Sequence, residues 1–364
     1  MLTKKHNFGA GPCILPDSVL TRASEAVKHW DRADLSILEI SHRSTEFELV
    51  VRETEFLVRE LLDVPETYSI LFLQGGASMQ FAMVPMNFLG TGQKAAYLEA
   101  GFFGEKAIKE ARISGDVTVV ATSKDTHYRS IPREYNIPAD AAYFHTTSNN
   151  TIEGTEMFNF PKSPVPVVCD MSSDIFSRVI NISDFDLIYA GAQKNMGPAG
   201  MTLVIVKNSF LDGIKNPVHA ILDYRVYRAN GSMYNTPPVF AIYTAMLNLQ
   251  WLKSKGGVKF IHMANLAKAQ LLYDEIDNNP LFYGLAEKTD RSLMNVTFRM
   301  YDKEKEEEFL SYAAGRGMVG IKGYRTIGGF RASLYNALPL ESVQALVDCM
   351  KTYIFKTKQN LVQV

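Results

Sequence analysis

The sequence has little cysteine, no surplus of either charge and no long apolar run. Its 364 residues include only three cysteines, and 38 Lys and Arg against 39 Asp and Glu give a formal net charge of −1. A protein built around a nucleic-acid backbone needs a strong basic surplus, so we expect no nucleic-acid partner. No apolar run reaches the roughly 20 residues of a membrane helix, so we expect no membrane-spanning protein.

The three cysteines, Cys13, Cys169 and Cys349, lie far apart along the chain and are odd in number. They form neither a disulfide framework nor a metal-binding spacing, so we expect no metal site. The first residues include two lysines but no apolar stretch behind them, which is not the pattern of a secretory signal. These features predict a reducing, cytoplasmic location.

The composition is that of a globular protein, with 46% hydrophobic and 21% charged residues. At about 150 residues per domain, the length suggests two domains. The first part of the chain alternates short apolar runs with helical stretches. These runs are Ser69–Leu73, Lys94–Leu98, Val117–Ala121, Ala141–His145, Pro166–Asp170, Leu187–Ala190 and Thr202–Val206. Because most of them lack polar alternation, they predict an α/β domain with a mostly parallel seven-stranded sheet covered on both faces.

The pattern changes in the second part of the chain, where long helices accompany fewer strands. The expected helices are Phe240–Lys253, Gly257–Asn278, Lys303–Arg316 and Leu340–Phe355, and the expected strands are Leu293–Met300, Val319–Lys322 and Phe330–Tyr335. This order predicts a smaller α+β domain. We place the boundary near Gly256-Gly257, which divides the chain into an N-terminal arm (1–16), a large domain (17–256) and a small domain (257–364).

The first candidate for a binding site follows the first strand. Ligands of open α/β sheets bind at the carboxyl ends of strands, and here the strand leads into Gln74-Gly75-Gly76-Ala77-Ser78 and a helix predicted over Ser78–Leu89. Two glycines permit a sharp turn, Ser78 can cap the helix, and free N–H groups at a helix start bind anions. The segment lacks the Gly-Lys-Ser/Thr ending of a nucleotide-binding P-loop. An ordinary strand-to-helix turn has the same appearance.

Two further strand ends carry Asp170 and Lys194. Asp170 could cap a following helix or point a carboxylate into the site. Lys194 could be a surface lysine, but the small residues around it leave room for a flat ring beside its amine. A Schiff-base lysine, an aspartate facing a pyridinium nitrogen and a phosphate-binding turn are together what pyridoxal phosphate requires.

From Phe8 to Ala337 the chain resembles the phosphoserine aminotransferases, which are pyridoxal 5'-phosphate-dependent transferases of fold type I. The resemblance rests on Asn7-Phe8-Gly9-Ala10-Gly11-Pro12, Glu39-Ile40-Ser41-His42-Arg43-Ser44, Gln74-Gly75-Gly76-Ala77-Ser78, Asp170-Met171-Ser172-Ser173, Ala190-Gly191-Ala192-Gln193-Lys194-Asn195, Asn235-Thr236-Pro237-Pro238 and Gly329-Phe330-Arg331-Ala332-Ser333. Matches to all of these in order are not expected by chance. The Ser-His-Arg-Ser segment separates this family most clearly from its relatives.

The resemblance implies a role for each matching residue at the cofactor. Lys194 forms the Schiff base, and Asp170 faces the pyridine nitrogen, whose charge keeps the carboxylate ionised. Thr151 lies near the ring hydroxyl. The other implied contacts are Ala77, Ser78 and Gln193 at the cofactor phosphate, Phe103 stacked on the ring, and Asn235 and Thr236 reaching that phosphate from the second subunit of a homodimer with shared sites.

The resemblance also implies how two anionic ends of a substrate are held. Arg331 binds the α-carboxylate, since a guanidinium can pair a carboxylate through two hydrogen bonds. His42, Arg43 and Arg325 bind the phosphate side. Read alone, Arg331 could be a structural ion pair, and His42-Arg43 a solvated loop.

The chain departs from the family at three positions. Phe103 stands where the stacking residue is usually Trp, and Phe102 is a possible alternative for it. Ser78 stands where some members have Arg, and Tyr324 where many have His. The substrate phosphate therefore depends more heavily on His42 and the neighbouring arginine.

The implied reaction transfers an amino group between glutamate and 3-phosphohydroxypyruvate, giving O-phosphoserine and 2-oxoglutarate in serine biosynthesis. One alternative is another fold-type I enzyme, such as a different aminotransferase or a cysteine desulfurase, which needs an exposed nucleophilic cysteine. Another is a non-catalytic protein that binds a phosphorylated metabolite. Such a protein would not need Lys194, Asp170 and Arg331 together.

Overall fold

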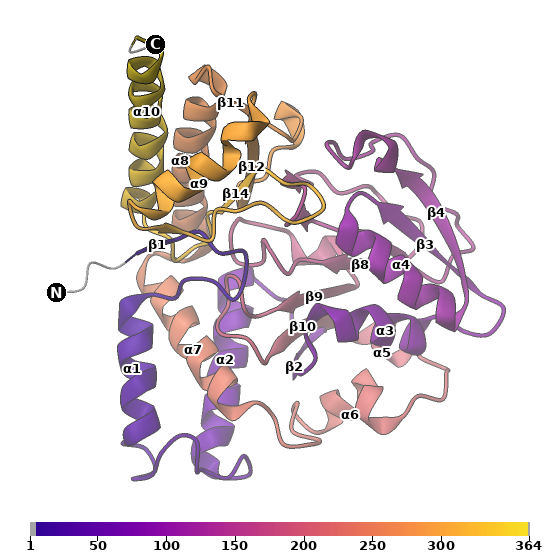
Figure 1. The fold of residues 1–364 in the computed structure, drawn as a ribbon. Helices are drawn as coiled ribbons and strands as arrows, with labels where there is room; N and C mark the ends of the chain where they lie inside the picture. The colour runs from indigo at the N-terminus through magenta and orange to yellow at the C-terminus, as the bar shows by residue number, and fades with distance from the viewer. Residues whose placement is uncertain (1–4, 363–364) are drawn as a thin grey trace.

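The computed structural model describes residues 5–362, and side chains up to residue 354. Residues 1–4 of the predicted arm and 363–364 of the predicted small domain lie outside the described residues. The chain forms a large part built on a central sheet and a smaller part that carries the C-terminal helix (Figure 1).

The central sheet has seven strands in the order β2-β10-β9-β8-β5-β3-β4. They are β2 (Tyr68–Leu73), β3 (Lys94–Glu99), β4 (Asp116–Thr122), β5 (Phe144–Thr147), β8 (Val167–Asp170), β9 (Leu187–Gly191) and β10 (Thr202–Lys207). Only β10 runs antiparallel to its neighbours β2 and β9. The predicted mostly parallel seven-stranded sheet is therefore confirmed, although β5 begins later than the apolar run Ala141–His145 suggests.

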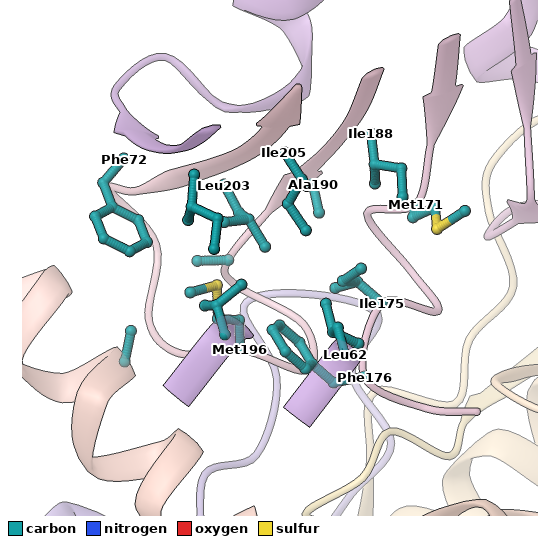
Figure 2. Close-up of a cluster of buried hydrophobic side chains, with 14 of the residues drawn as sticks. Leu62, Phe72, Met171, Ile175, Phe176, Ile188, Ala190, Met196, Leu203 and Ile205 are labelled. Atoms are coloured by element: carbon teal, nitrogen blue, oxygen red, sulfur yellow. The ribbon is translucent and has the colours of Figure 1, made fainter. Parts of the chain in front are cut away.

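Alternate side chains of each strand enter two different cores. Ile70 and Phe72 of β2 join the core formed with α1 (Asp17–Lys28), α2 (Thr45–Leu62) and α7 (Val239–Ser254). Figure 2 shows part of this core, where Phe72 lies near side chains of the neighbouring strands. Leu71 and Leu73 join the opposite core, with α3 (Gly76–Phe88), α4 (Phe102–Ser114), α5 (Asn208–Asp212) and α6 (Tyr224–Ala229). Both faces of the sheet are covered, which explains the absence of polar alternation.

The turn after β2 differs from the prediction at its cap. Helix α3 begins at Gly76, and Gly75 is its N-cap in the left-handed conformation with φ 87°. No side chain caps the helix, so the expected capping role of Ser78 is wrong. A Cβ on Gly75 would lie 2.5 Å from the Cβ of Met79, so both the turn and the space require glycine there. The glycine turn starts the helix two residues early and places Ser78 inside its first turn.

The smaller part has its own sheet and its own buried cluster. It contains β11 (Phe282–Gly284), β12 (Asn295–Met300), β14 (Phe330–Ser333), α8 (Gly257–Asn278), α9 (Glu306–Ala314) and α10 (Leu340–Val362). Four predicted elements are shorter than expected. The strand at 319–322 is reduced to β13 (Met318–Val319), and the helix at 303–316 begins as a 3-10 turn before α9. The strands at 293–300 and 330–335 each lose two residues, at the start of β12 and at the end of β14.

The N-terminal arm is attached to this smaller part. Its strand β1 (His6–Asn7) pairs in parallel with β13, and Phe8 lies in the same buried cluster as α8, α9 and α10. Gly256 and Gly257, with φ of 95° and 72°, form the junction between α7 and α8. The domain limits at 16–17 and 256–257 stay predictions. The start of α8 still packs in the core of the large part, through Val258 and Ile261, and the separate cluster of the smaller part begins farther along that helix, at Ala269.

An aromatic cluster dominates the core of the smaller part. The ring centroid of Phe309 lies 5.0 Å from Phe282, 5.1 Å from Phe330 and 5.2 Å from Tyr353. We expect Phe309→Ala to lower the free energy of unfolding by about 3–5 kcal/mol, because it leaves a cavity among these rings. Urea denaturation followed by circular dichroism measures the loss. Phe260→Ala, at a side chain 57% exposed, is the control and should cost under about 1 kcal/mol; equal losses would contradict the assigned core.

Candidate active site

A cavity of about 410 Å³ lies at the carboxyl ends of β2, β8 and β9. Its volume is within the usual range for small-molecule sites, about 300–1,000 Å³. Eight of the residues predicted from the sequence line it: Ala77, Ser78, Phe103, Thr151, Asp170, Gln193, Lys194 and Arg331. They come from segments far apart in the sequence. The central sheet brings Ala77, Asp170 and Lys194 together because its parallel strands end at one edge, whereas Arg331 comes from the smaller part.

Lys194 presents its amine to hydroxyl groups inside this cavity. Its Nζ donates to Thr151 Oγ1 at 2.7 Å and to Ser173 Oγ at 3.3 Å, and lies 5.7 Å from the centroid of the Phe103 ring. Burial lowers the pKa of the amine to about 8, while the Asp170 carboxylate acts in the opposite direction. A far larger fraction of this amine than of an exposed lysine is therefore neutral near physiological pH and able to act as a nucleophile or base.

The backbone at Lys194 is held from two sides. The Cys13 thiol in the N-terminal arm donates to the Lys194 carbonyl at 2.6 Å, and the Cys13 N–H donates to the Gln193 carbonyl at 3.1 Å. From the smaller part, the Asn336 N–H donates to Asn195 Oδ1 at 3.0 Å. The arm and the smaller part thus fix the segment from which the amine projects.

Asp170 is the last residue of β8 and is buried. Its Oδ1 accepts from the Ser172 N–H at 2.9 Å, and its carbonyl accepts from the Ser148 N–H at 3.0 Å. Burial raises the pKa of the carboxyl, while the Ser172 hydrogen bonds and the charge of Lys194 oppose that effect. A cationic group placed beside it would favour the ionised form further.

The start of α3, where the sequence predicts an anion site, lies at the cavity wall. The first turn of this 13-residue helix carries no acidic residue and no capping side chain, so its backbone N–H groups remain available. Gly75, Gly76, Ala77 and Ser78 all line the cavity at this point. A phosphate or carboxylate would be stabilised there by the N–H groups and by the helix dipole.

The structure distinguishes between the two candidate aromatic residues. Phe103 lines the cavity and faces Lys194, whereas Phe102 contacts Tyr324 at 5.7 Å between ring centroids and Lys106 at 4.9 Å from Nζ to centroid. Phe103 is therefore the ring placed to stack on a flat ligand.

Arg331 projects into the cavity from β14 of the smaller part. Its Nη1 donates to the Thr151 carbonyl at 3.3 Å, and its Nε is buried without a hydrogen-bond partner among the described residues. Burial lowers the pKa of the guanidinium, which nevertheless stays charged at any physiological pH. It can pair with a carboxylate of a ligand.

Five predicted site residues do not line the cavity of their own chain: His42, Arg43, Arg325, Asn235 and Thr236. Arg43 is exposed just before α2. Asn235 Oδ1 accepts from the Tyr227 hydroxyl at 3.3 Å, and the Thr236 carbonyl accepts from Gln74 Nε2 at 2.9 Å. The segment at 235–236 thus lies beside the residues that lead into the anion site.

The cavity also contains residues for which the sequence predicted no role: Ala10, Gly11, Phe81, Thr147, Asn149, Ile152, Ser172 and Ser173. Gly75 and Gly76 of the expected anion-binding turn line it as well, as does Tyr324. Ser173 is the most notable, because its hydroxyl lies 2.7 Å from Thr151 Oγ1 and also contacts Lys194. Its position three residues after Asp170 was the available signal, but only the fold places it opposite the lysine.

The described part of the chain has neither a metal-binding cluster nor a membrane-spanning helix. No three His, Cys, Asp or Glu side chains in it gather as a metal ion would require. None of its helices combines the length and the apolar character needed to cross a bilayer.

Comparison with known proteins places the chain in one family. The aminotransferase class-V family matches residues 5–346. The phosphoserine aminotransferase of Flavobacterium psychrophilum is 55% identical over 96% of this chain and 98% of its own length. A phosphoserine aminotransferase structure that records radiation damage of its Schiff base has a TM-score of 0.94 and 44% identity, over 96% of this chain and 99% of that one. The PLP-bound phosphoserine aminotransferase from Trichomonas vaginalis has a TM-score of 0.92 and 37% identity, over 96% and 100% of the two chains.

The environment of Lys194 predicts an unusual pH dependence for its amine. We expect reaction with pyridoxal 5'-phosphate, trapped with borohydride and located by mass spectrometry, to rise with pH, to be half-maximal near pH 8 and to level off at higher pH, because the neutral amine is the nucleophile. Lys194→Arg is the control and should give no adduct at this position. A midpoint near 10.5, the ordinary value for lysine, would contradict the assigned environment.

Proposed function

The chain belongs to the class-V aminotransferases and, within them, to the phosphoserine aminotransferases, and we propose that its cavity binds pyridoxal 5'-phosphate and transfers an amino group between glutamate and 3-phosphohydroxypyruvate. The products are O-phosphoserine and 2-oxoglutarate, in a step of serine biosynthesis. The observation that carries this proposal is the amine of Lys194, buried in one cavity with the Asp170 carboxylate, an uncapped helix start and Arg331.

The residues of the cavity fit this cofactor. The open start of α3, with Ala77, Ser78 and the nearby Gln193, would hold its phosphate. Phe103 would stack on its ring, Thr151 would bind its ring hydroxyl and Asp170 its pyridine nitrogen. When bound, pyridoxal 5'-phosphate supplies an electron sink for the carbanion that forms at the substrate α-carbon.

Lys194 moves the proton in this reaction. Its amine is neutral in large part near pH 8, so Nζ can accept a proton from the substrate α-carbon and would then deliver it to the carbon that carried the cofactor's aldehyde. The hydroxyls of Thr151 and Ser173 accept hydrogen bonds from Nζ and hold it in one orientation. Asp170 contributes a fixed negative charge that favours protonation of the group beside it.

Arg331 binds the α-carboxylate that glutamate and the phosphorylated substrate share. The distal end of the substrate differs, because glutamate offers a carboxylate and the other substrate a phosphate. His42, Arg43 and Arg325 are proposed to bind this end. The binding residues must accept both groups, although the carboxylate is smaller and less charged.

A homodimer with shared sites would complete the cavity. The only cationic side chains that line it are Lys194 and Arg331, among the described residues, and neither is free to hold a second anionic end. His42 and Arg43 lie outside the cavity of their own chain, as do Asn235 and Thr236. We propose that a second copy supplies such groups to each site.

The thiols of the chain argue against a cysteine desulfurase. Burial raises the pKa of Cys13 to about 12 and that of Cys349 to about 11, and raises the pKa of Cys169 well above its ordinary value. A thiol that resists ionisation is a poor nucleophile. All three cysteines are free, which is consistent with the proposed cytoplasmic location.

The colour of the purified protein tests the proposed function. We expect a visible absorption band from bound pyridoxal 5'-phosphate that is lost in Lys194→Ala together with at least about 10²-fold of the transamination rate, because Nζ is both the attachment point and the base. Lys109→Ala, at an exposed lysine, is the control and should keep both. A wild-type protein that stays colourless with added cofactor would refute the assignment.

The substrate is tested with O-phosphoserine and 2-oxoglutarate, compared with other amino donors. O-phosphoserine should be strongly preferred over unphosphorylated serine, which lacks the second anionic end. Equal rates with O-phosphoserine and serine would indicate an aminotransferase of a different substrate specificity. Any turnover at all would exclude the alternative of a non-catalytic binding protein.

Arg43 should distinguish the two half-reactions. We expect Arg43→Ala to lower kcat/KM for O-phosphoserine about 10- to 100-fold, because it removes a charge-assisted hydrogen bond to phosphate, and to affect glutamate less. Single half-reactions followed by absorbance measure the two substrates separately. Arg52→Ala, at an exposed arginine of α2, is the control. Equal losses with both substrates would remove Arg43 from the phosphate side.

A further inference from the structure

A short turn in the large part contacts Lys194, Arg331 and the helix that carries Phe103. Residues 151–154, here called the hairpin turn, connect β6 (Asn149–Asn150) with β7 (Thr155–Glu156), which pair antiparallel. The turn is closed by the Gly154 N–H, which donates to the Asn150 carbonyl at 2.8 Å. Thr151, at its start, accepts a hydrogen bond from the amine of Lys194.

The smaller part docks on the backbone of this hairpin turn. Thr297 of β12 and Arg331 of β14 lie directly opposite each other in their strand pair, so both side chains emerge on one face. Thr297 Oγ1 donates to the Glu153 carbonyl at 2.8 Å, and Arg331 Nη1 donates to the Thr151 carbonyl at 3.3 Å. The contact is close, since a Cβ on Gly154 would lie 2.5 Å from Thr297 Oγ1.

The Glu153 side chain connects the same turn to the helix that carries Phe103. Its Oε1 accepts from the N–H of Phe102, the first residue of α4, at 2.9 Å. The N-cap of α4 is Gly101, which has no side chain to cap the helix. The Phe102 N–H has no acceptor within α4, and Glu153 provides one. Phe103 is the next residue along, and its ring lines the cavity.

The other oxygen of Glu153 has no partner. Oε2 is buried and unpaired, and Arg331 Nε, nearby and of opposite charge, is also buried and unpaired among the described residues. Burial raises the pKa of the Glu153 carboxyl to about 7, and the charge of Arg331 partly counters this. Glu105 of α4 also faces this carboxyl and raises its pKa, and Glu153 in turn raises the pKa of the Tyr128 hydroxyl.

We propose that Glu153 is a positioning residue with two separable effects: its hydrogen bond to the start of α4 sets the place of Phe103, and its charge sets the affinity of Arg331 for the substrate α-carboxylate. This inference rests on the proposed function. Neither effect requires Glu153 to contact the substrate. The hydrogen bond acts on Phe103 through the backbone of α4, and the charge acts on Arg331 electrostatically.

The charge effect has a definite sign. A carboxylate bound to Arg331 brings a second negative charge toward Glu153, and like charges disfavour the ionised form. Substrate binding is therefore coupled to proton uptake by Glu153, and the affinity for glutamate rises as pH falls through about 7. Both substrates share the α-carboxylate, so both should respond equally.

Glu153→Gln tests the charge effect, because glutamine keeps an oxygen acceptor for the Phe102 N–H and removes the charge. At pH 8 we expect KM for glutamate and for O-phosphoserine each to fall about fivefold, with kcat little changed. The added affinity that wild type gains between pH 8 and pH 6 should largely disappear in the variant. Glu110→Gln, the same change at an exposed position of α4, should leave both substrates and the pH profile as in wild type.

Glu153→Ala tests the positioning effect, because alanine removes the acceptor as well. We expect the visible circular dichroism band of bound pyridoxal 5'-phosphate to change and the cofactor affinity to fall about tenfold, since Phe103 loses its fixed position. Glu153→Gln should keep the wild-type band and affinity. Thermal unfolding of each variant with cofactor identifies any loss that comes from misfolding.

The outcomes separate this inference from the proposed function. If wild type transaminates O-phosphoserine but Glu153→Gln has the wild-type KM at pH 8, the charge effect is refuted and the function stands. If Glu153→Ala folds and keeps the wild-type dichroism and cofactor affinity, the positioning effect is refuted. If wild type neither binds the cofactor nor transaminates, the proposed function itself fails.

Discussion

A lysine amine that is buried loses its hydration by water, and neighbouring hydroxyl groups replace that hydration only in part. The loss destabilises the charged form of the amine more than the neutral form. In this chain the amine of Lys194 meets two hydroxyls, from Thr151 and Ser173, and burial lowers its pKa to about 8. The rest of the site is arranged around this amine. The N-terminal arm holds the Lys194 carbonyl through Cys13, and the smaller part holds the next residue through Asn336.

The central sheet allows such burial because both of its faces are covered. Successive residues of β2, such as Leu71 and Phe72, enter different cores, so the strands are apolar throughout and only their carboxyl ends can carry polar side chains. Asp170 lies at one of these ends and Lys194 just beyond another. A rigid scaffold therefore sets the distance between the acid and the amine, while turns and helix starts provide the contacts around them.

The hairpin turn at 151–154 relates the two parts of the molecule. It is bound to the smaller part through Thr297 and Arg331, to the amine through Thr151 and to α4 through Glu153. The group proposed to bind a substrate carboxylate and the ring proposed to stack on a cofactor are thus both contacted by one short segment. A small displacement of that segment would therefore change the positions of Arg331 and Phe103 together.

Local sequence was sufficient for the strands, the fold class and three features of the cavity. The apolar runs predicted all seven sheet strands, and the glycine turn, Asp170 and Lys194 were recognisable because strand ends and small neighbours are visible in the chain itself. The resemblance to a known family added Thr151, Gln193 and Arg331, which line the cavity. No periodicity would have selected Arg331 among the arginines of the chain.

Other features were decided only in three dimensions. The sequence suggested Ser78 as the N-cap of the helix. In the structure the chain turns at Gly75, which adopts the left-handed conformation, and α3 therefore begins at Gly76 without a capping side chain. The choice of Phe103 over Phe102 depends on which side of α4 faces Lys194, and the unpaired atoms of Glu153 and Arg331 depend on how the smaller part docks. Strand pattern and residue chemistry are local properties that the sequence by itself determined. Burial, pKa and the meeting of distant side chains depend on what surrounds each group, and only the tertiary structure decided them.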